Sequence, residues 1–550
     1  MRKQTKIAAL ISAAAVLSVG GAMTAFAATG WQQENGTWVY YNRNEEKVTE
    51  TWQKSGDYWF YLDDNGEMAT DSLIDDNDDT YYVDINGVMV TNRWVAVDNE
   101  NAGEENEPNQ WWYYFGANGK AYKRSDSATG DVSLKTINGK KYTFDTDGKM
   151  QYGWVKDGET QHDENAWQDS EYYFGDENDG SMAEGWREIA IKDDQAADLQ
   201  PGDNYWDEDQ TRWFYFKASG KKEKSQTGKT INGRKYGFDE YGRMNAGWIT
   251  TATASNTKAA DGGSQGIATY SNSFLYYSTP EDGARSTKGW FKVTPGYYLQ
   301  KDKYEDGSDY WYYSDGNGKL VTNQIKTING KKYAFDNYGR MISGFVVLQM
   351  QQTGTAYSQK DIVDKLDDEN RYDTADNYTR FVQANDSLFR SGELRAYYFG
   401  SSDDGSMKTG KQSVDLDGEK VTFEFEKNGS KKGAGLIGMN DHKLYIGGKL
   451  TTADSDNKIE VVVLNSNNQL ITKSSVADAL ASYSTSATQH FKSNGDLDYT
   501  EYKFNNLPTG AKAYVVNTTG AMVKSGTKKD GDDYKVKTSN YTVDWVRLEE

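Results

Sequence analysis

Three near-identical segments recur along this chain of 550 residues, and this repetition constrains the fold more than any other feature. The segment Lys-Thr-Ile-Asn-Gly-Lys-Lys-Tyr begins at Lys135, and close copies begin at Lys229 and Lys326. Shorter aromatic segments recur between the copies and also ahead of the first copy. There, Trp31 and Trp52 show a basic period of about 21 residues. The sequence therefore predicts a quasi-one-dimensional repeat protein, in which each small unit packs on its neighbours and no single large core forms.

Each small unit is predicted to be a β-hairpin. Asn138-Gly139 and Asp147-Gly148 are dipeptides that accept the positive φ angles of tight two-residue turns. The flanking residues alternate aromatic or β-branched with polar side chains, as half-buried strands do. Because an isolated hairpin is only marginally stable in water, the hairpins must stack on one another. We expect an all-β fold, an elongated solenoid of stacked β-hairpin repeats with a degenerate β-rich C-terminal part.

Aromatic rings must supply much of the packing in this chain. It has 16 Trp, 40 Tyr and no Cys, and its mean hydropathy is −0.87. Fifteen of the Trp lie between Trp31 and Trp311, so any chemistry that needs Trp belongs to that part. Without Cys no disulfide can stabilise the fold. The formal charge of −21, without a basic block, excludes the electrostatic footprint of a nucleic-acid-binding protein.

The sequence divides into four parts. A basic start, an apolar stretch and Ala25-Phe26-Ala27 are typical of a secretory signal peptide, and no later run has the length of a membrane helix. Beyond Phe345 the repeats decay: Ser358–Leu366 and Val476–Leu480 favour short helices, whereas Ile459–Leu464 favours a strand. The predicted parts are a signal peptide (1–27), hairpin repeats (28–345), a polar insertion with a short helix (346–396), and degenerate repeats or a small β-rich domain (397–550).

A recurring pattern carries a resemblance to a known family. Gly30-Trp31 is followed by Trp38-Val-Tyr-Tyr41, and elsewhere Gly-x-Met precedes the next Gly-Trp, as from Gly148 to Trp154. This pattern resembles the cell-wall-binding, choline-binding-type repeat of Gram-positive surface proteins. The Thr-Ile-Asn-Gly-Lys-Lys-Tyr segment is similar to related repeats of clostridial toxins and glucansucrases. The resemblance implies a protein that is secreted and attached non-covalently to the cell wall or cell surface.

The resemblance also implies the binding sites. In choline-binding relatives, an aromatic cage forms between consecutive hairpins from the tryptophan of Gly-Trp and a following Trp/Tyr pair. Such a cage attracts a quaternary ammonium through the faces of its rings. Carried over position by position, the expected ligand-binding sets are Trp31 with Trp38 and Tyr40, Trp52 with Trp59 and Tyr61, Trp186 with Trp213 and Tyr215, and Trp290 with Trp311 and Tyr313.

These observations predict a non-catalytic, secreted surface protein that binds choline-substituted teichoic acid or a wall glycan. The repeats leave no long non-repetitive apolar segment for a catalytic domain, and a Gly-x-Ser-x-Gly match at Gly262–Gly266 lacks a predicted strand and helix around it. No cofactor, no metal site, no nucleic-acid partner and no membrane insertion are expected. Two alternatives stay open: an adhesin for host or dietary glycans, and wall-anchored display of a C-terminal module whose protein partner is unknown.

Overall fold

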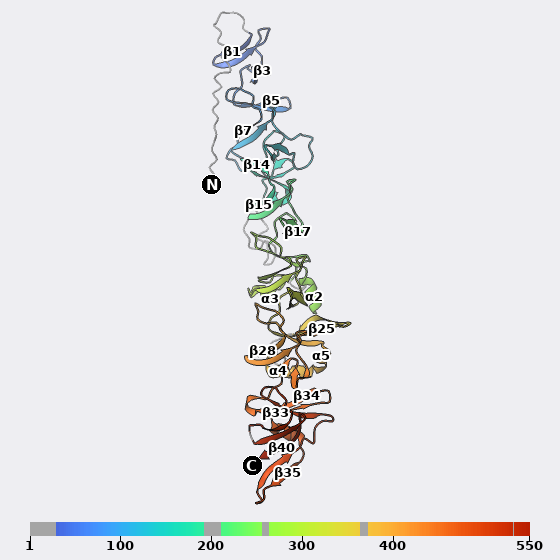
Figure 1. Ribbon diagram of the computed structural model, residues 1–550. Helices are drawn as coiled ribbons and strands as arrows, with labels where there is room; N and C mark the ends of the chain where they lie inside the picture. Colours follow the sequence, from blue (N-terminus) through green and yellow to red (C-terminus); the bar gives the residue numbers. More distant parts are fainter. Residues whose placement is uncertain (1–28, 192–210, 256–262, 364–371, 532, 550) are drawn as a thin grey trace. The chain divides into compact units, whose positions relative to one another are not determined.

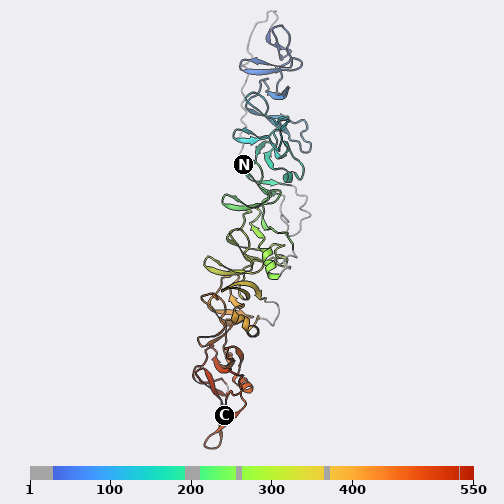
Figure 2. The ribbon, with the colours of Figure 1, turned by 90° about the vertical axis from the view of Figure 1, so that its right-hand side faces the viewer.

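The computed structural model describes residues 29–191, 211–255, 263–363, 372–531 and 533–549. The predicted signal peptide lies outside the described residues. Strands hold 46% of the described residues and helices 9%, so the predicted all-β class is confirmed. The chain divides into two units, residues 1–246 with 279–284, and residues 247–278 with 285–550. In each unit, hairpins follow one another in the order of the sequence (Figures 1 and 2).

The first unit consists almost entirely of antiparallel hairpins. Most are two-stranded, and one four-stranded sheet has the order β12-β11-β13-β14, with the short helix α1 (Ala166–Asp169) beside it. The strands are β1 (Gly30–Glu34), β2 (Thr37–Tyr41), β3 (Thr51–Ser55), β4 (Tyr58–Leu62), β5 (Ser72–Asp76), β6 (Asp79–Val83), β7 (Arg93–Asp98), β8 (Gln110–Phe115), β9 (Lys135–Ile137), β10 (Lys140–Tyr142), β11 (Gly153–Lys156), β12 (Glu159–Thr160), β13 (Tyr172–Asp176), β14 (Asp179–Met182), β15 (Gly185–Ala190), β16 (Thr211–Phe216), β17 (Gln226–Ile231) and β18 (Arg234–Phe238).

The second unit begins with hairpins and ends in larger sheets. Its first hairpins are formed by β19 (Gly247–Thr250), β20 (Phe274–Tyr277), β21 (Gly289–Val293), β22 (Tyr310–Ser314), β23 (Gln324–Ile328) and β24 (Lys331–Phe335). A three-stranded sheet follows, with β25 (Phe345–Thr353) between β26 (Ala356–Val363) and β27 (Leu394–Tyr398). A five-stranded sheet contains β28 (Gly410–Leu416), β29 (Glu419–Phe425), β30 (Gly438–Asn440), β31 (Lys443–Ile446) and β32 (Lys449–Leu450).

An eight-stranded sheet completes the second unit. Its strands are β33 (Ile459–Leu464), β34 (Leu470–Ser474), β35 (Ala487–Phe491), β36 (Leu497–Tyr502), β37 (Lys512–Asn517), β38 (Gly526–Lys529), β39 (Tyr534–Ser539) and β40 (Thr542–Glu549). The helices of the unit are α2 (Gly263–Ser271), α3 (Lys301–Glu305), α4 (Ala375–Ala384), α5 (Asp386–Ser391) and α6 (Val476–Tyr483), with a 3-10 turn, η2, at Ser455–Asn457. No helix among the described residues is long and apolar enough to cross a membrane.

The two predicted turn signals have different places in the fold. Asn138 and Gly139 have φ angles of 48° and 83° and connect β9 to β10 directly, which confirms a two-residue hairpin turn. Asp147-Gly148 instead lies in the loop between hairpins. There the Asp145 carboxylate accepts the backbone N–H groups of Asp147 and Lys149 at 3.0 and 2.8 Å. Side-chain capping of this kind fixes the loop locally, so it recurs wherever the aspartate and glycine recur.

Stacking depends on glycine in these loops. Gly220 has φ +87°, and a Cβ at this position would lie 2.3 Å from the Sδ of Met182, the last residue of β14. A Cβ on Gly283 would likewise lie 2.3 Å from the Sδ of Met244. A methionine of one repeat therefore packs directly on the backbone of the next. This contact explains why Gly and Met recur together in the sequence pattern.

The hydrophobic core is divided among neighbouring hairpins. One cluster in the first unit joins Ile231, Tyr236, Phe238 and Met244 to half-buried rings that include Trp186. Such small clusters confirm the prediction that no single large core forms in the repeats. The largest cluster of buried residues lies in the second unit, where Phe345, Tyr378 and Phe423 meet among others.

Of the two helix predictions, one is wrong and one is confirmed. Ser358–Leu366 is not a helix: residues 358–363 belong to β26, which pairs with β25, and residues 364–366 lie outside the described part. Pairing with a nine-residue strand overrides the local helical pattern there. The helices of that region are α4 and α5. The helix predicted at Val476–Leu480 is confirmed as α6, and the strand predicted at Ile459–Leu464 as β33.

Two further predictions concern the Gly-x-Ser-x-Gly match and the C-terminal part. A helix, α2, begins within the match, contrary to the expectation of no helix there. The β33–β40 sheet has a core of its own around Val461 and Val515, which favours the small β-rich domain. Its Val516–Met522 bridge still has the form of the repeat loops, so an echo of the repeats persists. The predicted boundaries at residues 345 and 396 stay predictions.

Candidate functional site

In seven of the described strand pairs, a tryptophan on the first strand faces a tyrosine directly across the pair. Trp186 is in register with Tyr215, for example, and their ring centroids are 5.2 Å apart at an interplanar angle of 71°. Seven such pairs have centroid separations of 5.0–5.4 Å and angles of 60–74°. They are Trp31–Tyr40, Trp52–Tyr61, Trp94–Tyr114, Trp154–Tyr173, Trp186–Tyr215, Trp248–Tyr276 and Trp290–Tyr313.

The next hairpin supplies a third ring to every pair. For Trp290 this ring is Tyr333, 4.8 Å away at 68°. In all seven cases the third ring lies 4.8–5.4 Å from the tryptophan and meets it edge to face. In chain order the third rings are Phe60, Tyr81, Tyr142, Phe214, Tyr236, Tyr312 and Tyr333. We call each set of three an aromatic site and name it by its tryptophan.

Three of the aromatic sites have nearly the same geometry. At the Trp94, Trp186 and Trp290 sites, the distance to the opposite tyrosine is 5.2 Å each time, and the distance to the third ring is 4.9, 4.8 and 4.8 Å. The three tryptophans are all half-buried, so each keeps part of its surface exposed to solvent. Rings that meet at steep angles form a corner. A fourth ring, Phe144, Phe238 or Phe335, lies against each tryptophan at 5.6–5.8 Å and 27–34°, so the corner is open to a ligand only on the exposed part of the indole.

The structure brings two of the four predicted sets together completely. Trp213 lies 6.3 Å from Trp186, and Trp311 lies 6.3 Å from Trp290, in addition to the tyrosine pairs Trp186–Tyr215 and Trp290–Tyr313. In the two N-terminal sets, Trp31–Tyr40 and Trp52–Tyr61 are paired. Within the described residues, Trp38 and Trp59 make no ring contact with these pairs, and Trp59 is 40% exposed.

The members of each predicted set lie on one hairpin, not on consecutive hairpins as the sequence analysis expected. The register pairs Trp31 with Tyr40 inside a single hairpin, and the next hairpin contributes only the third ring. These third rings, and the Trp94, Trp154 and Trp248 sites, were not predicted from the sequence. A signal for three of them was present, because Tyr142, Tyr236 and Tyr333 are the tyrosines of the Thr-Ile-Asn-Gly repeat.

At the Trp52 site, burial and nearby carboxylates favour the protonated tyrosine. Burial, then the charges of Asp76, Glu50 and Asp63, raises the pKa of Tyr61 above its ordinary value. The indole Nε1 of Trp52 donates to Asp76 Oδ2 at 3.1 Å, which fixes the ring and places a carboxylate beside the site. A neutral phenol attracts a cation through its ring face, and a nearby carboxylate adds to this attraction.

An internal cation fills the Trp154 site. Lys222 occupies the loop position that holds Met244 in the following repeat, and its Nζ lies 5.2 Å from the Trp154 ring centroid. This ammonium donates to the backbone carbonyls of Trp167 and Gln168 and is almost wholly buried. Burial, then repulsion by Lys224, lowers the pKa of Lys222 to about 7. The Trp154 ring thus already has a cation over it.

A neighbouring ring covers the Trp248 site. Phe291 stacks face to face on Tyr276, with centroids 4.6 Å apart and an interplanar angle of 5°. The indole Nε1 of Trp248 donates to the carbonyl of Thr294 at 2.8 Å, and a Cβ on Gly296 would lie 2.9 Å from the indole. Protein atoms therefore close on this site. The seven aromatic sites divide into five without such a filling group and two that are filled.

Comparison with known proteins finds similarity over parts of the chain. Residues 48–94 match the family model of the choline-binding repeat. The chain is 30% identical over 371 residues to glucosyltransferase-S of Streptococcus mutans serotype c, which covers 60% of this chain and 22% of that protein. The chain thus spans about a fifth of the length of this relative. The resemblance to choline-binding repeats and to glucansucrase-type repeats is confirmed.

Solved structures of choline-binding proteins are also similar to this chain. The choline-binding domain of CbpL from Streptococcus pneumoniae is 19% identical, with 54% of this chain and 97% of that chain covered and a TM-score of 0.24. The modular autolysin LytC from the same species is 14% identical, with 58% and 55% covered and a TM-score of 0.30. The choline-binding repeat supports a surface protein that binds the cell wall.

Proposed function

We propose that this protein is a secreted, non-catalytic surface protein that binds choline-substituted polymers of a Gram-positive cell wall. The observation that carries the proposal is the near-identity of the Trp94, Trp186 and Trp290 sites, whose three rings have the same separations within 0.1 Å. The repetition follows from the repeated sequence that builds each corner, and a polymer with repeated choline groups is the kind of ligand that several equal corners suit. The Trp31 and Trp52 sites are included in the proposal because they are also unfilled.

The chemistry is the attraction of a quaternary ammonium to aromatic faces. Each well-placed ring contributes about 0.5–2 kcal/mol. One site with three rings therefore binds choline with a free energy of about −4 kcal/mol, which corresponds to a millimolar Kd. A wall polymer presents many choline groups, and several weak sites on one chain gain avidity through their effective concentration. The ligand is captured and no bond is made or broken.

The two filled sites take no part in this proposal. Lys222 already supplies a cation over Trp154, and a second positive charge there would be repelled. Phe291 covers the face of Tyr276 at the Trp248 site. The proposal therefore assigns choline to five of the seven sites and excludes the other two, which makes it testable site by site.

The test is co-sedimentation of the purified protein with cell walls that carry phosphocholine. We expect the protein to pellet with these walls, to be released by millimolar choline, and to stay in solution with walls whose phosphocholine has been removed. A variant with Trp94→Leu, Trp186→Leu and Trp290→Leu should pellet poorly, while Trp154→Leu should pellet like the wild type. Pelleting that is unaffected by choline and by the triple variant would overturn the proposal.

Glucan binding is the second candidate, because the curated relative is a glucosyltransferase. In that case the same rings would stack on sugar faces, and side chains such as Asp76 would accept hydrogen bonds from hydroxyl groups. Soluble glucan oligosaccharides, and not choline, would then release the protein from its target.

The third candidate is wall-anchored display of the C-terminal part. In that case removal of residues 397–550 should leave wall attachment intact while it removes the biological effect.

A further inference from the structure

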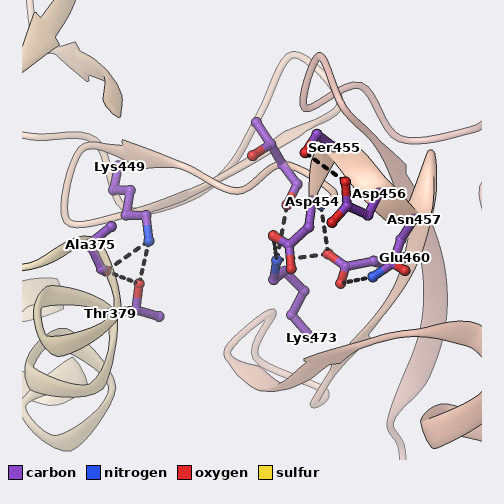
Figure 3. A network of polar contacts seen from close by, with 10 residues as sticks. Ala375, Thr379, Lys449, Asp454, Ser455, Asp456, Asn457, Glu460 and Lys473 are labelled. Atoms are coloured by element: carbon purple, nitrogen blue, oxygen red, sulfur yellow. Dashed lines mark hydrogen bonds and ion pairs between the residues drawn. The ribbon is translucent and has the colours of Figure 1, made fainter. Parts of the chain in front are cut away.

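A polar cleft lies in the second unit, apart from the aromatic sites. Its volume is about 880 Å³, within the usual range of about 300–1,000 Å³ for ligand pockets. It is lined by the N-terminal turn of α4, the first residues of β29 and the segment from β32 to β34. Figure 3 shows the two polar groups on its walls, one around Lys449 and one around Lys473. This cleft has room for a ligand the size of a short oligosaccharide.

Threonine is the commonest residue of the lining, beside seven charged side chains, and no tryptophan, tyrosine or phenylalanine belongs to it. Six threonines line the cleft: Thr374, Thr379, Thr422, Thr451, Thr452 and Thr518. The charged residues of the lining are Lys420, Lys449 and Lys473 against Asp376, Glu419, Asp454 and Glu460, so neither sign prevails strongly. A wall of this composition suits a ligand with many hydroxyl groups and little net charge, and it differs in kind from a corner of aromatic rings.

Lys449 supplies an ammonium with spare hydrogen-bonding capacity. Its Nζ donates to the carbonyl of Ala375 and to Thr379 Oγ1, both at 2.8 Å, and its third hydrogen is unassigned. No carboxylate of the described chain lies within ion-pair distance of it, and burial lowers its pKa. The ammonium is half-buried and its two acceptors are neutral, so it can donate a third hydrogen bond. An oxygen atom of a ligand in the cleft can accept that bond.

Thr451 is a second and independent sign of an unmade contact. Its side chain is 5% exposed and lines the cleft, and its Oγ1 has no hydrogen-bond partner. A buried hydroxyl without a partner costs stability, so its presence calls for an explanation. The Oγ1 atom has almost no accessible surface, so a ligand in the cleft reaches it only when the side chain turns to another χ1 rotamer.

The opposite wall is rigid and already satisfied. Lys473 Nζ donates to Asp454 Oδ1 at 2.8 Å and to Glu460 Oε2 at 2.7 Å, and Glu460 also accepts from Asn457 at 3.0 Å (Figure 3). The Glu460 side chain is 4% exposed. This network fixes the far wall of the cleft, while Lys449 and Thr451 provide the free hydrogen-bonding groups. One fixed wall and one wall with free donors are features of a preformed polar site.

We propose that this cleft binds a neutral glycan of two to three sugar rings through hydrogen bonds to Lys449 and Thr451. Sugar hydroxyls both donate and accept, so they can satisfy the ammonium and the threonine hydroxyl at once. The proposal goes beyond choline binding, because it gives the C-terminal part a ligand of its own. The chain would then hold the wall by its repeats and present a second, sugar-binding site in the second unit.

The test is calorimetric titration of the full chain with maltotriose, cellotriose and triacetylchitotriose, in saturating choline so that the aromatic sites are occupied. Trigalacturonic acid serves as the anionic probe. We expect at least one neutral trisaccharide to bind, and Lys449→Met and Thr451→Val each to weaken it tenfold or more. Ser170→Ala removes another buried hydroxyl without a partner, far from the cleft in sequence and in the first unit, and should leave the Kd unchanged.

Melting temperature separates a binding defect from misfolding. Thr451→Val removes a hydroxyl that has no partner, so its melting temperature should equal or exceed that of the wild type while sugar binding falls. Three results would overturn the proposal: no neutral trisaccharide binds, only the uronic-acid trimer binds, or binding survives both cleft variants. Choline binding in a separate titration is independent of all three, so failure here is distinguishable from failure of the proposed function.

Discussion

Replacing Lys222 by methionine should stabilise the first unit at neutral pH. The lysine side chain is 2% exposed, and burial lowers its pKa from 10.5 to about 7. Each pKa unit corresponds to about 1.4 kcal/mol, so at pH 7 the shift costs the folded state about 4 kcal/mol. The two hydrogen bonds to the carbonyls of Trp167 and Gln168 offset part of this cost. We therefore expect Lys222→Met to gain about 1–3 kcal/mol at pH 7.

The pH dependence gives a sharper signature than the gain itself. Between pH 7 and 10.5 the unfolded chain keeps the Lys222 proton and the folded chain has lost it, so the stability of the wild type rises with pH. The expected slope from this group is about 1.4 kcal/mol per pH unit, and it vanishes below pH 7, where both states are protonated. Methionine cannot titrate, so the variant should lack this slope.

The assay is hydrogen exchange of peptides from residues 211–246, because a repeat array does not unfold as one unit. Opening free energies from pH 7 to 9.5 should rise in the wild type and stay level in Lys222→Met. Lys221→Met is the matched control: Lys221 is exposed and pairs with Glu171, so its removal should leave the slope unchanged. A destabilised Lys222→Met with the wild-type slope would refute the assignment of Lys222 as a strained internal cation.

Two further predictions concern the loops between hairpins. Gly220→Ala should lower the free energy of unfolding in urea by about 1–3 kcal/mol, because the new methyl group meets Met182. Gly233 has a similar φ but open space around it, so Gly233→Ala should lower this free energy by less. Equal decreases in the two variants would contradict the stacking contact. Burial raises the pKa of Asp145 to about 6, and Lys149→Arg should lower it by adding the ion pair that arginine makes in two equivalent loops. Carbon-13 NMR titration of the carboxyl group measures this pKa, and an unchanged value would contradict the explanation.

The hairpins could be predicted from sequence because their signals are local. Asn138-Gly139 specifies its own turn, and alternation on either side specifies the strands. The pairing of Trp186 with Tyr215 likewise follows from register once the hairpin is recognised. Composition predicted the reliance on aromatic packing for the same reason, since it depends on no long-range contact.

The third ring of each aromatic site is harder to predict, because repetition marks Tyr142, Tyr236 and Tyr333 as recurring residues but not as neighbours of a tryptophan. Tyr236 reaches Trp186 only because one hairpin stacks on the next, across a loop of variable length that the sequence does not place. The closure of the Trp154 site depends likewise on the burial of Lys222, which sequence spacing alone does not reveal. The false helix at Ser358–Leu366 has the same cause, because β26 exists through its pairing with β25.

The central claim is that open aromatic corners bind choline and filled ones do not. Equilibrium dialysis of the full chain with labelled choline counts the sites directly. Single variants Trp94→Leu, Trp186→Leu and Trp290→Leu should each remove one bound choline, whereas Trp154→Leu should remove none. If the wild type binds no choline, or if Trp154→Leu removes as much as Trp290→Leu, the claim is contradicted.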